Sequence, residues 1–185
     1  MKLLSIWCAG RPYAAILLSC ALLFSLPAHA AAAPHILAEI PTARLAGEGN
    51  FRWFGLKLYD AQLWVSGAGY PPVPPYALEL RYARTLQGAK IAEASRDEMR
   101  KLGLGSEAQH AAWLTAMQRL FPDVQEGSRL TGVHRAGLGA RFYLDGKLLG
   151  EIADVQFANA FFAIWLAPKT SAPELRAALL QNAAQ

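Results

Sequence analysis

The apolar residues of this chain fall into two consecutive blocks, and each block shows a run of strand-like spacing followed by a pair of helix-like spacings. In the first block, apolar and polar residues alternate over 59–65 and again over 78–82, which is typical of half-buried strands. A hairpin, or two strands with a break near Gly55, is expected over 43–65. A helix is expected over 88–102, where Gly103 stops it.

Capping signals mark the second helix of this block. Ser106 and Gln109 have the spacing of a capping box, in which each side chain satisfies a backbone N–H at the helix start. Pro122 ends the same helix, because proline has no N–H to donate.

The second block repeats the order. Three strands are expected in succession, over 129–134, 140–144 and 147–152. Asp145-Gly146 separates the last two and is a strong hairpin signal. A helix follows and ends at Pro168; its one apolar face is formed by Phe157, Ala160, Phe161, Ile164 and Trp165. A second capping box, Ser171 with Glu174, is expected to open the final helix.

This order of elements predicts the fold class. Strands that are segregated from helices favour an α+β domain with a mainly antiparallel sheet and helices packed on one face. The 185 residues are enough for one domain with a single sizeable core.

The first thirty residues have the features of a secretory signal peptide. Lys2 and Arg11 are their only charged residues, an apolar run over 14–26 follows, and Ala28-His29-Ala30 supplies the small residues of a cleavage site. A bilayer-spanning helix takes roughly 20 apolar residues, which is longer than this run. We therefore expect cleavage near Ala30, with a retained membrane anchor or a lipid anchor on Cys20 as the alternatives.

We therefore divide the chain into a signal peptide (1–30), a leader segment (31–42) and a domain (43–185). Removal of the signal peptide by cleavage implies a periplasmic protein with no stable membrane span. Both cysteines leave with the signal, so the remaining chain has no thiol and no disulfide. Loss of Lys2 and Arg11 lowers the formal charge from +4 to +2. The remaining basic residues are scattered, which argues against a nucleic-acid partner.

A search for a catalytic centre finds little. His35, His110 and His134 stand alone in sequence, without the i, i+4 partner or the nearby carboxylates that a metal site needs. No G-x-S-x-G nucleophile motif is present. The pairs Gly47/Gly49 and Gly137/Gly139 are interpreted as turn glycines, since neither continues as a phosphate-binding loop. No metal and no cofactor is expected.

The first hairpin carries the one candidate binding cluster, Arg52 with Trp53, Tyr59 and Trp64. An arginine beside aromatic strand residues can hold a carboxylate through two hydrogen bonds at the mouth of an apolar pocket. The alternative is an exposed strand arginine whose aliphatic stem lies on core aromatics.

Several segments, taken in order, resemble the chalcone isomerase-like family. They are 47–65, which has the form G-x-G…K-x-Y-x-A-x-L, then 121–124 with 130–133, 150–154 with 157–166, and 173–180. The resemblance spans nearly all of 43–180 and is greatest to the exported bacterial branch. It implies an open-faced β-sandwich, with helices packed over a large sheet.

The resemblance does not extend to the residues that catalyse the namesake reaction, the cyclisation of a chalcone to a flavanone. That enzyme uses an arginine, a tyrosine, an asparagine and threonine or serine hydroxyls. The aligned positions hold Ile91 for the tyrosine, Glu98 for the asparagine, Ala158 for the late hydroxyl and Tyr59 for the threonine of the first hairpin. The arginine corresponds to Arg52 or to Arg44.

The resemblance thus implies an exported, non-catalytic protein that binds a small apolar ligand such as a fatty acid through Arg52 and Tyr59. An isomerase or lyase with relocated catalytic groups is one alternative. A cell-envelope interaction module is the other. The oligomeric state is left open.

Overall fold

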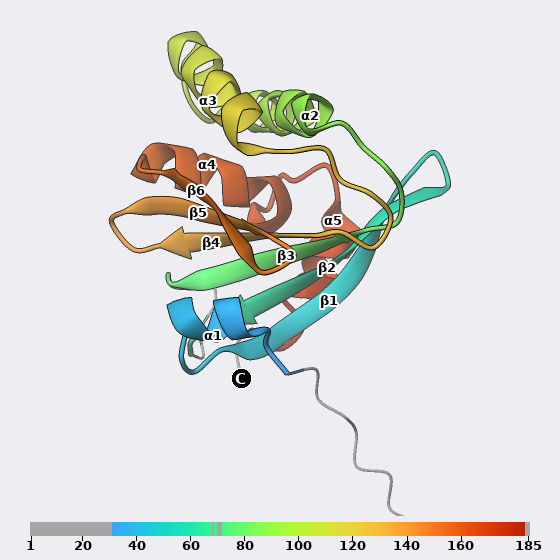
Figure 1. Cartoon of the computed structure of the whole chain (residues 1–185), viewed down its shortest axis with the longest axis vertical. Coiled ribbons are helices and arrows are strands. Elements are labelled where there is room, and N and C mark those ends of the chain that lie inside the picture. Colours follow the sequence, from blue (N-terminus) through green and yellow to red (C-terminus); the bar gives the residue numbers. More distant parts are fainter. Residues whose placement is uncertain (1–30, 68, 70–71, 184–185) are drawn as a thin grey trace, which may run out of the picture.

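Six strands form one antiparallel sheet, and their order across the sheet is their order along the chain (Figure 1). The computed structural model describes residues 31–67, 69 and 72–183, so the expected signal peptide lies outside the described residues. The strands are β1 (Arg44–Trp53), β2 (Leu56–Val65), β3 (Tyr76–Tyr82), β4 (Arg129–Arg135), β5 (Gly139–Leu144) and β6 (Lys147–Ile152). Two predictions are confirmed, the α+β class and the open antiparallel sheet.

Two of the connections are tight hairpins with left-handed backbone at both central residues. Asp145 and Gly146 have φ of 49° and 82°, and Phe54 and Gly55 have φ of 47° and 79°. Positive φ at both positions is the geometry that matches the right-handed twist of the flanking strands. The hairpins predicted at Gly55 and at Asp145-Gly146 are both confirmed.

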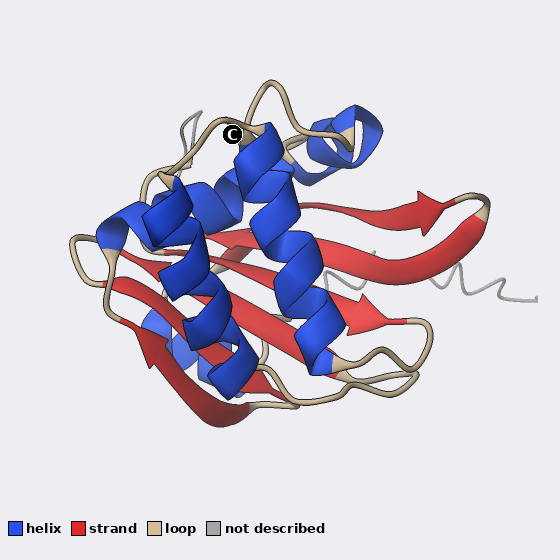
Figure 2. Ribbon diagram, turned by 90° about the horizontal axis from the view of Figure 1, so that it is seen from above, coloured by secondary structure: helices blue, strands red, loops and turns tan. Residues whose placement is uncertain are grey.

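Five helices accompany the sheet in the described part of the chain. They are α1 (Pro34–Glu39), α2 (Gly88–Lys101), α3 (Glu107–Leu120), α4 (Val155–Leu166) and α5 (Pro173–Leu179). Helix α4 lies on β4 and β5, α2 packs on α4 and α3, and α5 packs on β1 (Figures 1 and 2). None of the helices within the described residues is long and apolar enough to cross a bilayer.

Helix α4 is buried on more than the one face that its spacing predicts. Phe157, Phe161 and Trp165 form the predicted stripe, and Ala158 and Phe162 are also buried. The reason is its position between the sheet on one side and α2 on the other, which buries seven of its twelve residues.

The two predicted capping boxes have different outcomes. In α3, Ser106 and Gln109 exchange both hydrogen bonds, so this capping box is confirmed. In α5 the prediction is wrong, because the N-cap is Ala172 and makes no side-chain bond. The Ser171 hydroxyl instead donates to Glu98 Oε2 at 2.5 Å. A charge-assisted bond to a carboxylate of another helix is stronger than a local bond to backbone.

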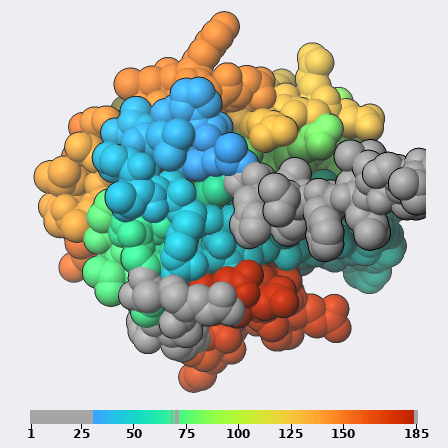
Figure 3. All heavy atoms as spheres, turned by 90° about the horizontal axis from the view of Figure 1, so that it is seen from below, coloured from blue at the N-terminus to red at the C-terminus, as the bar shows by residue number. Residues whose placement is uncertain are grey.

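The leader segment contains the short helix α1, which packs on the sheet face opposite α2, α3 and α4 (Figures 1 and 3). A small second core forms there, made of Ile36, Ile40, Trp64, Ala77, Val133 and Tyr143. Sequence spacing did not predict this helix. Trp64 is buried because α1 covers it, although its position in the alternation placed it on the open face.

Charged contacts fix the end of α1 to the sheet. Glu39 accepts hydrogen bonds from the Tyr143 hydroxyl at 2.5 Å and from Arg141 Nη1 at 2.7 Å, and Arg135 Nε lies 3.6 Å from its other oxygen. Burial by itself would raise the pKa of Glu39, but the bonds from Tyr143 and Arg141 outweigh it and hold that pKa below its ordinary value. Glu39 is thus an ionised anchor for the leader.

The glycines at 47 and 49 are packing glycines in β1 rather than turn residues, which corrects the prediction for that pair. A Cβ atom on Gly47 would lie 2.1 Å from the carbonyl oxygen of Ala178 in α5, and one on Gly49 would lie 2.9 Å from a methyl group of Leu175. The backbone of α5 therefore approaches the sheet at a distance that only glycine permits. Gly137 does lie in a turn, as predicted, and Gly139 follows that turn as the first residue of β5.

We predict that Gly47→Ala lowers the free energy of unfolding by about 2–3 kcal/mol or more, because the new methyl group would overlap a backbone oxygen that cannot move without displacing α5. Urea denaturation measures the change. Gly67→Ala is the control, since nothing lies within 4 Å of its added Cβ. Equal stability of Gly47→Ala and the control would contradict the close approach of α5.

Candidate functional site

Tyr59 lies in β2 and faces the helices, at the point where the sheet meets the end of α4. Its hydroxyl accepts a hydrogen bond of 3.0 Å from the indole nitrogen of Trp165. The Phe51 ring stacks on it with centroids 5.3 Å apart, and the Tyr82 ring meets it edge-on at 6.0 Å. The rings of Phe51 and Tyr82 therefore border the hydrogen-bonded pair of Tyr59 and Trp165.

A charged group of α2, Glu98, acts on this pair. Glu98 accepts hydrogen bonds from Lys101 Nζ at 2.7 Å and from the Ser171 hydroxyl at 2.5 Å. Burial raises the pKa of Tyr59 above its ordinary value; the Trp165 bond opposes this rise and the Glu98 charge adds to it. Tyr59 is consequently a neutral phenol at physiological pH, able to donate or accept a hydrogen bond.

Two of the positions that align with the family's catalytic polar groups hold apolar side chains that pack in the core. Ala158 is fully buried in α4, and Ile91 packs against the main core from α2. Glu98 is ionisable, but its oxygens are held by Lys101 and Ser171. Around Tyr59, the described residues offer no set of convergent donors that would stabilise an enolate.

Arg52, the predicted carboxylate ligand, lies near the end of β1 and is exposed. Its guanidinium donates to the carbonyl oxygen of Gly55 in the adjoining turn at 3.1 Å. Its backbone pairs with Lys57, one rung beyond the pair formed by Phe51 and Tyr59. Arg52 and Tyr59 thus occupy neighbouring rungs, but no contact joins their side chains among the described residues.

Arg44, the alternative counterpart, has a structural role. Its guanidinium donates to the carbonyl oxygens of Asn182 and Gly67, each at 2.8 Å, and to that of Ala183 at 3.3 Å. These bonds tie the C-terminal segment to the start of β1. A guanidinium used in this way is a poor candidate for a ligand's carboxylate.

The predicted aromatic cluster of the first hairpin is therefore dispersed. Trp64 faces α1 on the opposite side of the sheet, and Trp53 is 61% exposed near the turn. The residue that the sequence did not assign to the site is Trp165, which was interpreted only as part of an apolar helix face. Its contact with Tyr59 spans 106 residues, and no local pattern marks it.

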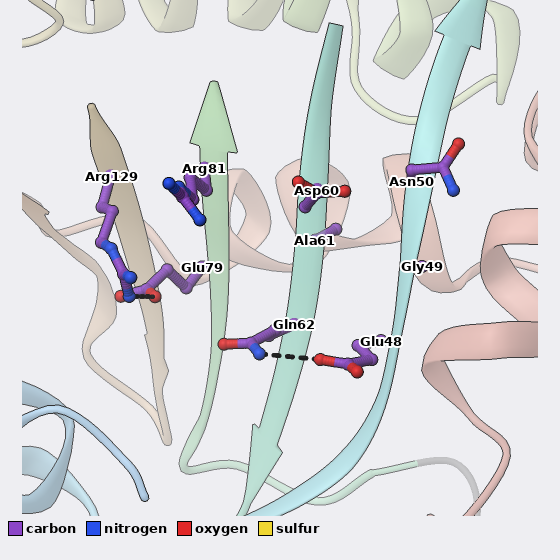
Figure 4. Close-up of a pocket in the computed structure, with 9 residues that line it drawn as sticks. All are labelled: Glu48, Gly49, Asn50, Asp60, Ala61, Gln62, Glu79, Arg81 and Arg129. Carbon is purple, nitrogen blue, oxygen red and sulfur yellow. Dashed lines mark hydrogen bonds and ion pairs between the residues drawn. The ribbon is translucent and has the colours of Figure 1, made fainter. Parts of the chain in front are cut away.

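A polar groove of about 440 Å³ lies on the sheet face opposite α4 (Figure 4). Its walls carry Glu48, Asn50, Asp60, Gln62, Glu79, Arg81 and Arg129, with Gly49 and Ala61 between them. Glu79 is 4% exposed and accepts from Arg129 Nη1 at 2.9 Å and from the Thr131 hydroxyl at 3.1 Å. Because the groove is lined mainly by charged and polar side chains, it does not suit an apolar ligand.

A second groove, of about 460 Å³, runs along the outer side of α4. Small residues of α4 form its floor, and the start of α3 with the α2–α3 connection forms its wall; the lining includes Ala160, Ala163, Ala167, Leu104 and Trp113. The Trp113 indole is held by a 2.8 Å bond to Asp154. Neither groove includes Arg52 or Tyr59.

The three histidines of the described chain have ordinary structural partners. His35 contacts the Thr131 hydroxyl at 3.0 Å, His110 the carbonyl oxygen of Leu104 at 2.8 Å, and His134 the amide oxygen of Asn159 at 2.9 Å. Over residues 31–67, 69 and 72–183, no group of three or more metal-ligating side chains is found.

Comparisons with known proteins agree with this architecture. The family model described as "Chalcone isomerase-like" matches residues 44–181. An "Uncharacterized protein" of Haemophilus influenzae is 27% identical over 135 residues, which cover 72% of this chain and 66% of the relative's length. The crystal structure of a fatty-acid binding protein of Arabidopsis thaliana superposes with a TM-score of 0.63, covering 77% of this chain and 89% of the other. Since the identity is 14%, this likeness shows the fold alone.

We predict that Tyr59→Phe lowers the free energy of unfolding by about 1–3 kcal/mol, because the buried Trp165 indole N–H would lose its acceptor. Thermal or urea denaturation measures the change. Tyr82→Phe is the control: it removes a hydroxyl from the neighbouring buried ring, for which no hydrogen bond is found among the described residues. Equal losses in the two variants would show that the Tyr59–Trp165 bond contributes nothing specific.

Proposed function

Because this chain belongs to the chalcone isomerase-like family, we propose that it is a non-catalytic member of the exported bacterial branch and binds a fatty acid. One observation carries the proposal. The interior around Tyr59 holds a neutral phenol bonded to an indole, with Ile91 and Ala158 where the enzyme has polar groups. These side chains are apolar or neutral, which suits a hydrocarbon chain better than acid–base chemistry.

The structural neighbour supports the choice of ligand. A protein that shares this fold is, by its description, a fatty-acid binding protein. The fold therefore accommodates fatty-acid binding in that protein, and a fatty acid is the ligand to test first here.

In the proposed complex, the ligand's carboxylate binds Arg52 and its acyl chain packs over Phe51 and Tyr59. The β1–β2 hairpin projects beyond the helices (Figure 2), so the Arg52 guanidinium is reachable from solvent. The next rung inward is the stacked pair Phe51 and Tyr59. A charged head at the rim and aromatic rings behind it match the two ends of a fatty acid.

We predict that Arg52→Ala weakens binding of a fluorescent fatty acid by about 10- to 150-fold, because a charge-assisted bidentate contact is lost. Arg52→Lys should retain only part of the affinity, since lysine keeps the charge but not the paired donors. Arg119→Ala is the matched control, an exposed arginine in the last turn of α3. Titration of the three variants and the wild type gives the dissociation constants.

Two results would overturn this assignment. Equal affinity in wild type and Arg52→Ala would remove Arg52 from the site. Absence of saturable binding to the wild type would remove the ligand hypothesis and favour an envelope interaction module.

Export is the second part of the proposal, and it rests on residues 1–30 of the sequence. The protein recovered from the periplasm of its own bacterium should begin near Ala31 and contain no cysteine. Intact mass measurement decides this. A full-length protein recovered only by detergent extraction would mean that the N-terminal segment is a retained anchor.

A further inference from the structure

The turn that joins β1 and β2 exposes three large apolar side chains next to one another. Trp53 is 61% exposed, Phe54 is 89% exposed and Leu56 is 53% exposed. This turn, with its flanking strand ends, is the part of the sheet that extends furthest beyond the helices (Figures 1 and 2). We call residues 53–56 the hairpin tip.

The other strongly exposed apolar residues in the described chain are isolated from one another in sequence. Val73 lies before β3, Leu138 lies in the turn between β4 and β5, and Leu148 lies in β6. Single exposed apolar residues are normal on a protein surface, whereas a contiguous group marks an interaction site. The hairpin tip is such a group.

Folding does not explain the choice of residues at the tip. Phe54 has a φ of 47°, a conformation that favours glycine or asparagine, and its ring is almost entirely in solvent. A phenylalanine here strains the backbone and buries little surface in return. The ring of Trp53 lies edge-on to that of Phe54 at 5.0 Å, so the two rings form one apolar end.

Basic side chains surround the base of the tip. Arg52 donates to the Gly55 carbonyl at 3.1 Å, and Lys57 follows the tip in β2. Asp60, the one acidic residue of β2, is paired with Lys57 at 2.6 Å. The adjacent strand β3 and the loop after it add exposed Arg81 and Arg84.

We propose that the hairpin tip inserts into the interfacial layer of an anionic lipid bilayer. Tryptophan is favoured at the level of lipid headgroups, and phenylalanine and leucine are favoured at the acyl boundary just below. Basic residues one rung behind the tip would meet the lipid phosphates. The proposal does not depend on fatty-acid binding, although it places the rim residue Arg52 at a membrane surface.

Vesicle flotation tests the proposal with vesicles of phosphatidylethanolamine and phosphatidylglycerol, and with vesicles of phosphatidylcholine alone. Wild type and variants are isolated from expressing cells in one processed form, verified by intact mass, so that residues 1–30 contribute equally. The tip variant is Trp53→Ser/Phe54→Ser/Leu56→Ser. The control is Leu138→Ser, which removes an exposed leucine from the opposite end of the sheet.

We expect wild type and control to float with the anionic vesicles. The partition coefficient of the tip variant should be at least about 10-fold lower, because three apolar side chains no longer leave water. Wild type should bind phosphatidylcholine vesicles much less than anionic ones. Brominated acyl chains should quench the wild-type fluorescence more than that of Trp53→Phe. Circular dichroism checks that each variant is folded.

The proposal is overturned if wild type does not float with anionic vesicles, if the tip variant floats equally well, or if phosphatidylcholine is bound equally. Concentration-dependent self-association that is lost in the tip variant, without vesicle binding, would assign the tip to a second copy of the chain. Fatty-acid titration of the same proteins keeps the two proposals separate, since either property can be lost while the other is retained.

Discussion

The position of α4 between the sheet and α2 is the constraint on which the rest of the fold depends. Phe157, Phe161 and Phe162 of this helix form a chain of ring contacts, and Phe142 of β5 contacts Phe157 and Phe161. Because seven of the twelve residues of α4 are buried, each neighbouring element has an apolar surface to pack against. The same packing brings Trp165, near the C-terminal end of α4, onto Tyr59.

Because the centre of the molecule is closely packed, the grooves and the exposed functional side chains lie at the margins of the sheet. The polar groove lies on the face that α1 covers only in part, and the second groove lies along the outer side of α4. The projecting hairpin carries Arg52 at its rim and aromatic side chains on its tip. A ligand head and a membrane surface would thus meet the protein at the same end of β1 and β2.

The sequence predicted the large elements well because their signals are local. Alternation over 59–65, the Asp145-Gly146 turn and the Ser106 capping box each depend on residues a few positions apart. Features that depend on distant residues were missed or misassigned. Helix α1 needs Trp64 and Tyr143 to pack against, and the close approach of α5 to Gly47 brings together residues more than 120 positions apart.

The candidate site shows the same limit. Arg52 and Tyr59 share a hairpin, which the sequence shows, but their side chains lie at the rim and in the interior, which only the fold reveals. The central claim is that a fatty acid occupies this end of the molecule. The decisive measurement is native mass spectrometry of the protein purified from its native source. We expect an added mass that matches a fatty acid, and we expect Arg52→Ala to reduce it greatly. Protein that carries no ligand, and takes up none from added fatty acid, would contradict it.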